Sequence, residues 1–241
     1  MKLETLNIWG GQIVEPLLKH IKEVRDDVDI FCLQEVFNGR SSPKAFPKAI
    51  VDIYSQIDEK LPEHQGYFAI SQNMGLATFL RKSIQVTEVE DKFVHRWKGA
   101  MINDDPSTMG RNIQYIQLEQ NGKLFTIVNF HGLWNGRGKT DTPDRIEQSQ
   151  KVKAFLDSVQ GAKILCGDFN LLPDTESIAI LEQGMRNLIT EHGVTSTRSE
   201  FYTKPGKLAD YILVSPEIQV RDFKVLQEPV SDHLPLQLEF S

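Results

Sequence analysis

The apolar positions of this chain switch repeatedly between two kinds of spacing. Apolar runs typical of strands cover residues 3–9, 29–36, 67–71, 76–81, 84–94, 113–119, 124–130, 163–166, 210–214, 220–226 and 234–240. Helical spacing covers residues 14–24, 46–57, 145–159 and 175–183, and Pro62 and Gly184 act as stop signals after the second and the last of these. Helix–strand alternation therefore surrounds a middle region that is rich in strands.

This order of elements predicts two β-sheets packed face to face, with helices on their outer faces. The step Asn121-Gly122, between the strands at 113–119 and 124–130, is a strong hairpin signal. The sequence has no internal repeats, low-complexity tracts or linkers rich in proline and glycine. Because strands in every part of the chain end in polar motifs, we expect a single domain over residues 1–241 rather than two.

Six short polar motifs stand at the ends of apolar runs. Taken singly, each is an ordinary strand end. Together they supply carboxylates, amides and imidazoles, which are the groups that one divalent metal ion and one phosphate ester require. The motifs are Leu6-Asn7-Ile8, Leu33-Gln34-Glu35-Val36, Asn129-Phe130-His131, Gly167-Asp168-Phe169-Asn170, Ala209-Asp210-Tyr211 and Ser231-Asp232-His233. The set predicts a metal-dependent phosphoester hydrolase.

The residue types within these motifs indicate particular chemistry. Asp168 and Asn170 lie two residues apart after an apolar run, so both side chains can point into one pocket. An aspartate there can take a proton from water, and the amide can donate to a phosphate oxygen. Asp232-His233 could bind a metal through the carboxylate and donate from the imidazole, and Glu35 suits a hard metal ion. A plain turn is the commoner origin of any one such motif, so only the set carries weight.

In this order and at this spacing, the motifs resemble those of the endonuclease/exonuclease/phosphatase superfamily. That group includes pancreatic-type deoxyribonucleases, AP endonucleases, neutral sphingomyelinases, inositol polyphosphate 5-phosphatases and poly(A) deadenylases. The likeness runs from Asn7 to the segment 231–236, which is nearly the whole chain. It implies a four-layer α/β sandwich, two packed mixed β-sheets flanked by helices, which agrees with the pattern of apolar positions.

The resemblance also implies a metal site. Glu35 would be the principal ligand of Mg²⁺ or Mn²⁺, with Asn7 beside it and Asp232 close to the metal. A metal held in this way would neutralise the negative charge on the phosphate oxygens during hydrolysis.

The remaining matching residues take catalytic roles by the same resemblance. Asp168 would orient or deprotonate the attacking water. Asn170 and His131 would hold phosphate oxygens and stabilise their growing charge. His233, paired with Asp210, would face the phosphate as an acid or an electrostatic stabiliser.

His131 narrows the choice among the branches of the superfamily. AP endonucleases tend to carry a motif without this histidine. A histidine at this position resembles the deoxyribonuclease, sphingomyelinase, phosphatase and deadenylase branches. The net charge is −6 and no lysine-rich extension is present, whereas a dedicated duplex-DNA binder usually has a basic face. We therefore rank an AP endonuclease below the broader group.

The loop at 132–139 follows His131 and combines an aromatic side chain, two cations and three glycines. One interpretation is a substrate clamp, in which Arg137 and Lys139 bind a second phosphate and Trp134 stacks on a base or an apolar group. The other is a solvated glycine loop with Trp134 packed on the surface, and the two are evenly balanced. Arg111 could likewise reach the phosphate or be an ordinary surface arginine.

Composition is ordinary for a globular protein, with 40% hydrophobic and 25% charged residues. No apolar stretch approaches the roughly 20 residues that span a bilayer, and no N-terminal leader is expected because it would include Asn7. Cys32 and Cys166 both lie in apolar runs, which predicts buried free thiols and favours a reducing, cytoplasmic setting.

The leading interpretation is thus a phosphodiesterase or nuclease acting on a phosphoester, with nucleic acid as one candidate substrate and no sign of an obligate protein partner. The second is a phosphomonoesterase or a lipid-headgroup phosphohydrolase that uses the same residues, because loops rather than the metal site choose the substrate. The third is an inactive binding module. It has little support because every expected charged position is filled.

Overall fold

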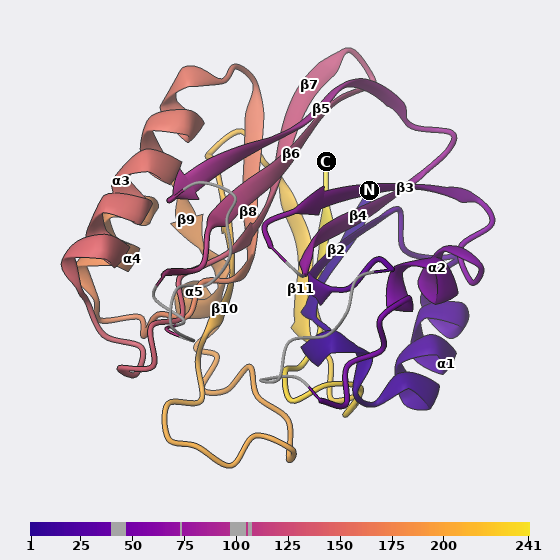
Figure 1. The fold of residues 1–241 in the computed structure, drawn as a ribbon. Helices are drawn as coiled ribbons and strands as arrows, with labels where there is room; N and C mark the ends of the chain where they lie inside the picture. The colour runs from indigo at the N-terminus through magenta and orange to yellow at the C-terminus, as the bar shows by residue number, and fades with distance from the viewer. Residues whose placement is uncertain (40–46, 73, 97–104, 106–107) are drawn as a thin grey trace.

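The computed structural model describes residues 1–39, 47–72, 74–96, 105 and 108–241. Two sheets of six strands each pack face to face, and helices cover their outer faces (Figure 1). The helices α1 and α2 lie beside one sheet, and α3 and α4 lie beside the other. Their bounds are Val14–Val24 for α1, Ile53–Asp58 for α2, Pro143–Ser158 for α3 and Glu176–Glu182 for α4. The predicted four-layer α/β sandwich with two mixed sheets is confirmed.

The first sheet has the strand order β11-β12-β1-β2-β4-β3. Strands β1 and β2 are parallel, and the other neighbours are antiparallel. The strands are β1 Lys2–Asn7, β2 Ile30–Val36, β3 His64–Ile70, β4 Gly75–Arg81, β11 Val220–Val225 and β12 Leu236–Phe240.

The second sheet has the order β5-β6-β7-β8-β10-β9, with β7 and β8 parallel. The predicted hairpin joins β6 and β7, and Asn121 and Gly122 take φ values of 54° and 72° in its turn. The strands are β5 Gln85–His95, β6 Arg111–Gln120, β7 Lys123–His131, β8 Ala162–Asp168, β9 Arg186–Asn187 and β10 Asp210–Val214.

The topology brings the ends of several strands to one edge of the sandwich. Parallel neighbours such as β1 and β2, or β7 and β8, end at the same edge of their sheet. Strand β10 runs antiparallel to β8, and Asp210 at its start pairs with Asp168 at the end of β8. Strand β12 runs antiparallel to β1, so the segment before it also reaches this edge.

Several element boundaries differ from the sequence prediction. The first strand ends at Asn7, and Trp9 begins a short 3₁₀ turn, Trp9–Gly11, in which all three residues have positive φ. Trp9 is half-buried. Helix α2 begins at Ile53 instead of residue 46; Phe46 itself lies outside the described residues. The last strand begins at Leu236, two residues later than predicted.

Two short elements were not predicted at all. They are β9 and α5 Leu188–Glu191, each only a few residues long. Such pieces are too short to show a hydrophobic period, and Asn187 caps α5 by accepting from two backbone N–H groups.

One hydrophobic core lies between the two sheets and includes residues of α3 and α4, and a second packs α1 and α2 on the first sheet. Phe125 from β7 meets Phe240 from β12 with ring centroids 5.9 Å apart. Cys32 and Cys166, from one sheet each, are fully buried free thiols, as the sequence predicts. No helix among the described residues is long and apolar enough to cross a membrane.

A buried amide pair joins the two sheets through hydrogen bonds. Gln34 Nε2 in β2 donates to Asn129 Oδ1 in β7 at 2.7 Å and to Thr5 Oγ1 at 3.1 Å. Asn129 Nδ2 donates back across the interface to the carbonyls of Leu33 and Ala77, at 3.1 and 3.2 Å. Because both side chains are almost fully buried, no water replaces a lost partner at low cost.

We expect Asn129→Ala to destabilise the fold by about 2–6 kcal/mol, because the carbonyls of Leu33 and Ala77 each lose a buried partner, at about 1–3 kcal/mol each, whereas Gln34 keeps two other acceptors. Urea unfolding measures the change. Thr126→Val is the matched control: Thr126 lies in the same strand, is fully buried, and its hydroxyl has no hydrogen-bond partner in the described part of the chain. Equal losses from the two variants would contradict the role assigned to the amide pair.

Candidate active site

Asp168 lies at the centre of the polar edge, 2% exposed at the end of β8. Asn7 Nδ2 donates to its Oδ2 at 3.0 Å, and the backbone N–H of Asn170 donates to its Oδ1 at 2.9 Å. Burial opposes ionisation of this carboxyl, but the charges of His233 and Arg198 outweigh it and lower its pKa. Asp168 is therefore an ionised, oriented carboxylate.

His233 and Asp210 form a buried hydrogen-bonded pair. His233 Nδ1 lies 2.7 Å from Asp210 Oδ1, and Asp210 Oδ2 accepts from the Thr197 hydroxyl at 2.6 Å. His233 Nε2 points toward Asp168, 3.6 Å from its Oδ2. Burial and Arg198 lower the pKa of His233, but the carboxylates around it outweigh them and raise it overall. The imidazole is thus oriented by one aspartate while its other nitrogen faces a second one.

Glu35 occupies a strained position at a bulge in the pairing of β2 with β4. Its φ of 57° is in the left-handed region, which is uncommon for a residue with a side chain. Its Oε1 lies 3.8 Å from His131 Nε2, and its buried Oε2 has no hydrogen-bond partner within the described ranges. Burial and the nearby charge of Asp232 raise the pKa of Glu35 to about 7.

His131 and Asn170 complete the wall around Asp168. His131 Nε2 lies 3.9 Å from Asp168 Oδ2, and burial together with Arg111 lowers the pKa of His131 to about 3, so its imidazole is neutral. Asn170 also has a left-handed backbone, with φ 55°, and its Nδ2 donates to the Gly132 carbonyl at 3.3 Å. A Cβ at Gly132 would lie 2.1 Å from the Phe169 carbonyl oxygen, so this close approach requires glycine.

The structure thus brings together the eight residues predicted for catalysis and metal binding. Asp232 lies beside His233, with its Oδ1 3.7 Å from His233 Nε2. Ser231, which precedes it, fixes this segment by donating to the Asn7 carbonyl at 2.6 Å. The eight are Asn7, Glu35, His131, Asp168, Asn170, Asp210, Asp232 and His233.

The donor set fits a divalent metal ion. Glu35 offers a buried oxygen that meets no partner in the described part of the chain, and Asn7 and Asp232 add hard oxygen donors of the kind that Mg²⁺ and Mn²⁺ bind. Asp168, Asp210 and His233 also have ligand atoms within 4.8 Å of one another. That second group is already satisfied internally, because His233 is hydrogen-bonded to Asp210. The unpartnered oxygen of Glu35 is the stronger indication of where a metal would bind.

Arg111, one of the predicted substrate contacts, is buried at the start of β6 and its Nε donates to the Gly132 carbonyl at 3.2 Å. Its Nη1 is buried without a hydrogen-bond partner among the described residues. Burial lowers the pKa of Arg111, and the charges of Glu35 and Asp168 partly offset this effect. An open N–H group therefore remains on a buried guanidinium close to both carboxylates.

The other three predicted substrate contacts occupy the loop after His131. Lys139 is buried, and its Nζ donates to the carbonyls of Gly206 and Leu208 at 2.7 and 3.0 Å. It thereby ties this loop to the loop at 199–209, and burial together with Arg198 lowers its pKa to about 8. Trp134 is half-buried, with Lys204 Nζ 5.6 Å from its ring centroid, whereas Arg137 is exposed.

Sequence reasoning missed Arg198 as a component of the site. It belongs to the loop before β10, which is orange in Figure 1, and its side chain is only 4% exposed. Its Nη1 lies 3.4 Å from Asp232 Oδ2 and contacts His233 Nε2. No hydrophobic period or familiar motif marks this loop, and only the three-dimensional arrangement reveals the arginine.

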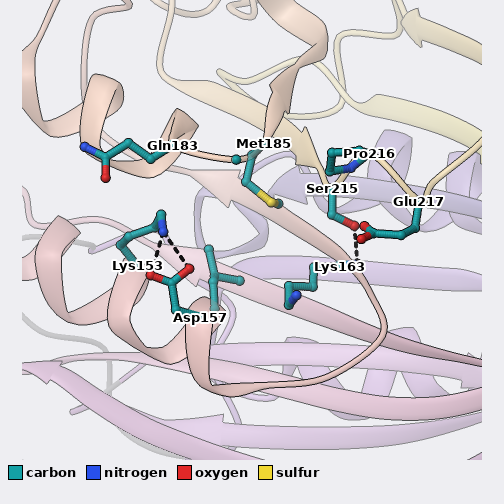
Figure 2. A pocket seen from close by; sticks show the side chains of 10 residues that line it. Lys153, Asp157, Lys163, Gln183, Met185, Ser215, Pro216 and Glu217 are labelled. Atoms are coloured by element: carbon teal, nitrogen blue, oxygen red, sulfur yellow. Dashed lines mark hydrogen bonds and ion pairs between the residues drawn. The ribbon is translucent and has the colours of Figure 1, made fainter.

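A cavity of about 300 Å³ lies at the end of the second sheet where β8 begins (Figure 2). It is lined by Lys163 at the start of β8, whereas Asp168 ends that strand. Lys153 and Asp157 of α3 form an ion pair beside it, with oxygens 2.5 and 2.6 Å from the ammonium. This cavity is therefore separate from the polar edge that carries the candidate active site.

Comparison with solved structures shows the same fold at low sequence identity. A family protein from Leptotrichia buccalis C-1013-b is 19% identical, with TM-score 0.76, and the match covers 100% of this chain and 99% of that one. The mannosyl-6-phosphatase of Bacteroides thetaiotaomicron VPI-5482 is 18% identical, with TM-score 0.73 and coverage of 100% and 99%. TDP2 from D. rerio, complexed with a single-strand DNA product, is 14% identical, with TM-score 0.74 and coverage of 100% and 98%.

No curated protein sequence matches the chain. The model of the Endonuclease/Exonuclease/phosphatase family matches residues 5–233, a stretch that includes every residue of the polar edge described above. The activities in the family's name all break phosphoester bonds. This chain belongs to the endonuclease/exonuclease/phosphatase family.

Proposed function

We propose that this protein is a divalent-metal-dependent phosphoester hydrolase, most simply a phosphodiesterase or nuclease, in which Asp168 activates the attacking water. The observation that carries the proposal is the pairing of two different carboxylates at one edge of the sandwich. Asp168 is held ionised by neighbouring positive charge, whereas Glu35 has an oxygen without a hydrogen-bond partner among the described residues. Because Asp168 is ionised, it can accept a hydrogen bond and a proton from the attacking water, whereas the open oxygen of Glu35 suits a metal ligand.

Glu35, Asn7 and Asp232 would hold Mg²⁺ or Mn²⁺. Such an ion supplies positive charge to the phosphate oxygens as the phosphorus gains its fifth bond. Asn7 Oδ1 already accepts from the Trp9 backbone N–H at 2.9 Å, which fixes the amide with its second lone pair free.

Asp168 and the side chains around it have different roles in the proposed hydrolysis. Asp168 takes the proton of the attacking water. Asn170 and the neutral His131 hold phosphate oxygens, each worth on the order of 100-fold in rate. His233, which is oriented by Asp210, faces the phosphate as an acid or an electrostatic stabiliser.

Substrate contacts extend from this centre. Arg111 Nη1, which has no hydrogen-bond partner within the described ranges, supports a role in binding a phosphate oxygen. In the loop after His131, Trp134 and Arg137 are accessible for a base and a second phosphate, and Lys139 contributes positive charge while holding the loop in place. The named relatives include both a protein bound to DNA and a sugar phosphatase, so nucleic acid and small phosphoesters are both substrates to test.

The deciding experiment is hydrolysis of a mixed panel in Mg²⁺, Mn²⁺ or EDTA. The panel contains plasmid DNA, single-stranded DNA and RNA, bis-p-nitrophenyl phosphate, p-nitrophenyl phosphate, inositol phosphates and sphingomyelin. We expect cleavage of a diester that requires metal and is lost in EDTA. Cleavage of monoesters alone would transfer the assignment to a phosphatase. Hydrolysis that continues in EDTA would refute the metal-dependent reaction.

A further inference from the structure

We propose that Arg198 binds the phosphate group of the substrate directly, as an additional phosphate-binding residue of this site. The inference rests on the proposed function and deepens it. It starts from the position of the guanidinium, whose Nη2 lies 4.0 Å from Asp168 Oδ2 and whose Nη1 contacts His233 Nε2. Because Asp168 and His233 both face the reacting phosphate, Arg198 is within reach of the same phosphate oxygens.

The nitrogen atoms of the Arg198 guanidinium differ in their hydrogen-bond partners. Nη1 is engaged by Asp232 and His233. Among the described residues, Nε is buried without a hydrogen-bond partner and Nη2 makes no hydrogen bond. Nε and Nη2 form the edge with which arginine binds carboxylate or phosphate through two parallel hydrogen bonds. A buried edge of this kind is costly to leave unpaired, which indicates a ligand.

Arg186 shows what this edge does when it serves only as an ion-pair partner. Its Nε and Nη2 donate to the two carboxylate oxygens of Glu191 at 2.9 and 2.8 Å on the protein surface. If Arg198 were only a counter-ion, its edge would meet Asp168 or Asp232 in the same way. Instead, the nearest oxygen of Asp168 remains 4.0 Å from Nη2. The edge is therefore held open beside the acid that would activate water.

Tyr202 holds the plane of the guanidinium. The Arg198 Cζ lies 4.4 Å from the centroid of its ring, so the aromatic side chain stacks on one face. Burial lowers the pKa of Arg198, but Asp210, Asp168 and Asp232 outweigh it and raise the pKa overall, so the side chain stays charged. A fixed, charged fork is well suited to phosphate oxygens, and Tyr202 acts as its positioning residue.

The test uses Arg198→Gln and Arg198→Lys, with Arg186→Gln as the matched control. The substrate is a phosphoester cleaved by the wild type, and inorganic phosphate serves as the competing probe. For Arg198→Gln we expect kcat/KM to fall about 100-fold, and the inhibition constant of phosphate to rise at least about tenfold. Arg198→Lys keeps the charge among the three carboxylates, which protects folding, but it lacks the two-pronged edge. It should also bind phosphate more weakly.

A second readout separates phosphate binding from a purely structural role. Thermal melting is followed in Mg²⁺ with and without inorganic phosphate. We expect the Arg198 variants to keep the stabilisation by Mg²⁺ and to lose the additional stabilisation by phosphate, while Arg186→Gln keeps both. Unchanged phosphate inhibition in Arg198→Lys, with wild-type hydrolysis intact, would overturn the inference and leave the proposed function standing. Absence of hydrolysis by the wild type would instead refute the proposed function.

Discussion

Asp168→Asn is expected to lower kcat by about 10²–10⁴-fold, the contribution of a positioned general base. The amide keeps the shape of the side chain, and its oxygen can still accept from the Asn170 backbone N–H, which lies 2.9 Å from Oδ1 in the wild type. It has no affinity for the proton of water. Steady-state kinetics on a diester in Mg²⁺ measures the loss.

Two further measurements distinguish a loss of the catalytic step from a loss of folding or of metal binding. The far-UV circular dichroism spectrum should be unchanged, and Mg²⁺ should still raise the melting temperature, because Glu35 remains in place. Asp222→Asn is the matched control, since Asp222 is a surface carboxylate of β11 that pairs with Lys224. Turnover by Asp168→Asn at the wild-type rate would remove Asp168 from the mechanism and, with it, the reaction scheme proposed here.

The composition of the candidate site could be predicted from the sequence because the topology is regular. Asn7 and Asp168 end strands that each have a parallel neighbour, and parallel strands end at the same edge. Asp210 and His233 lie at or before strands that run the other way, so they begin where the others end. Polar residues at the boundaries of apolar runs therefore identified the set of candidates, and the resemblance to the family assigned their roles.

The contacts between sheets could not be predicted in this way. Gln34 and Asn129 are 95 residues apart and lie in different sheets, yet they share a hydrogen bond at the interface. The alternation of apolar and polar residues along a strand does not indicate which residue of another sheet a given side chain contacts. The same limit hid Arg198, whose contacts to Asp232 and His233 join a loop to a segment more than 30 residues away.

Backbone strain was also invisible in the sequence. Glu35 and Asn170 both adopt left-handed backbone conformations, with φ of 57° and 55°, although neither is glycine. Strained conformations of this kind persist only where surrounding contacts impose them, and they gather at functional sites. Here they direct a carboxylate and an amide into the same polar edge. The fold thus uses part of its stability to orient two side chains.

Glu35→Gln is the second variant for which we expect a large effect, and its sign differs between stability and activity. At pH 8 in EDTA, the variant should melt at a higher temperature than the wild type. The substitution removes a buried negative charge that lies near Asp232 and has one oxygen without a partner in the described structure. A gain of about 1–3 kcal/mol is expected from relieving such a group, and each kcal/mol corresponds to about 2–4 °C for a chain of this size.

In Mg²⁺ the order should reverse. The wild type gains stability because the metal binds the folded state, whereas Glu35→Gln lacks the anionic ligand and should gain little. Its hydrolytic activity should fall below detection. Glu119→Gln, at an exposed position of β6, is the matched control and should behave as the wild type in both solutions. A carboxylate that serves as a metal ligand destabilises the fold when no metal is bound, so its replacement should raise stability in EDTA. Lower stability of Glu35→Gln in EDTA, or retained metal-dependent hydrolysis, would instead show that Glu35 is a structural carboxylate.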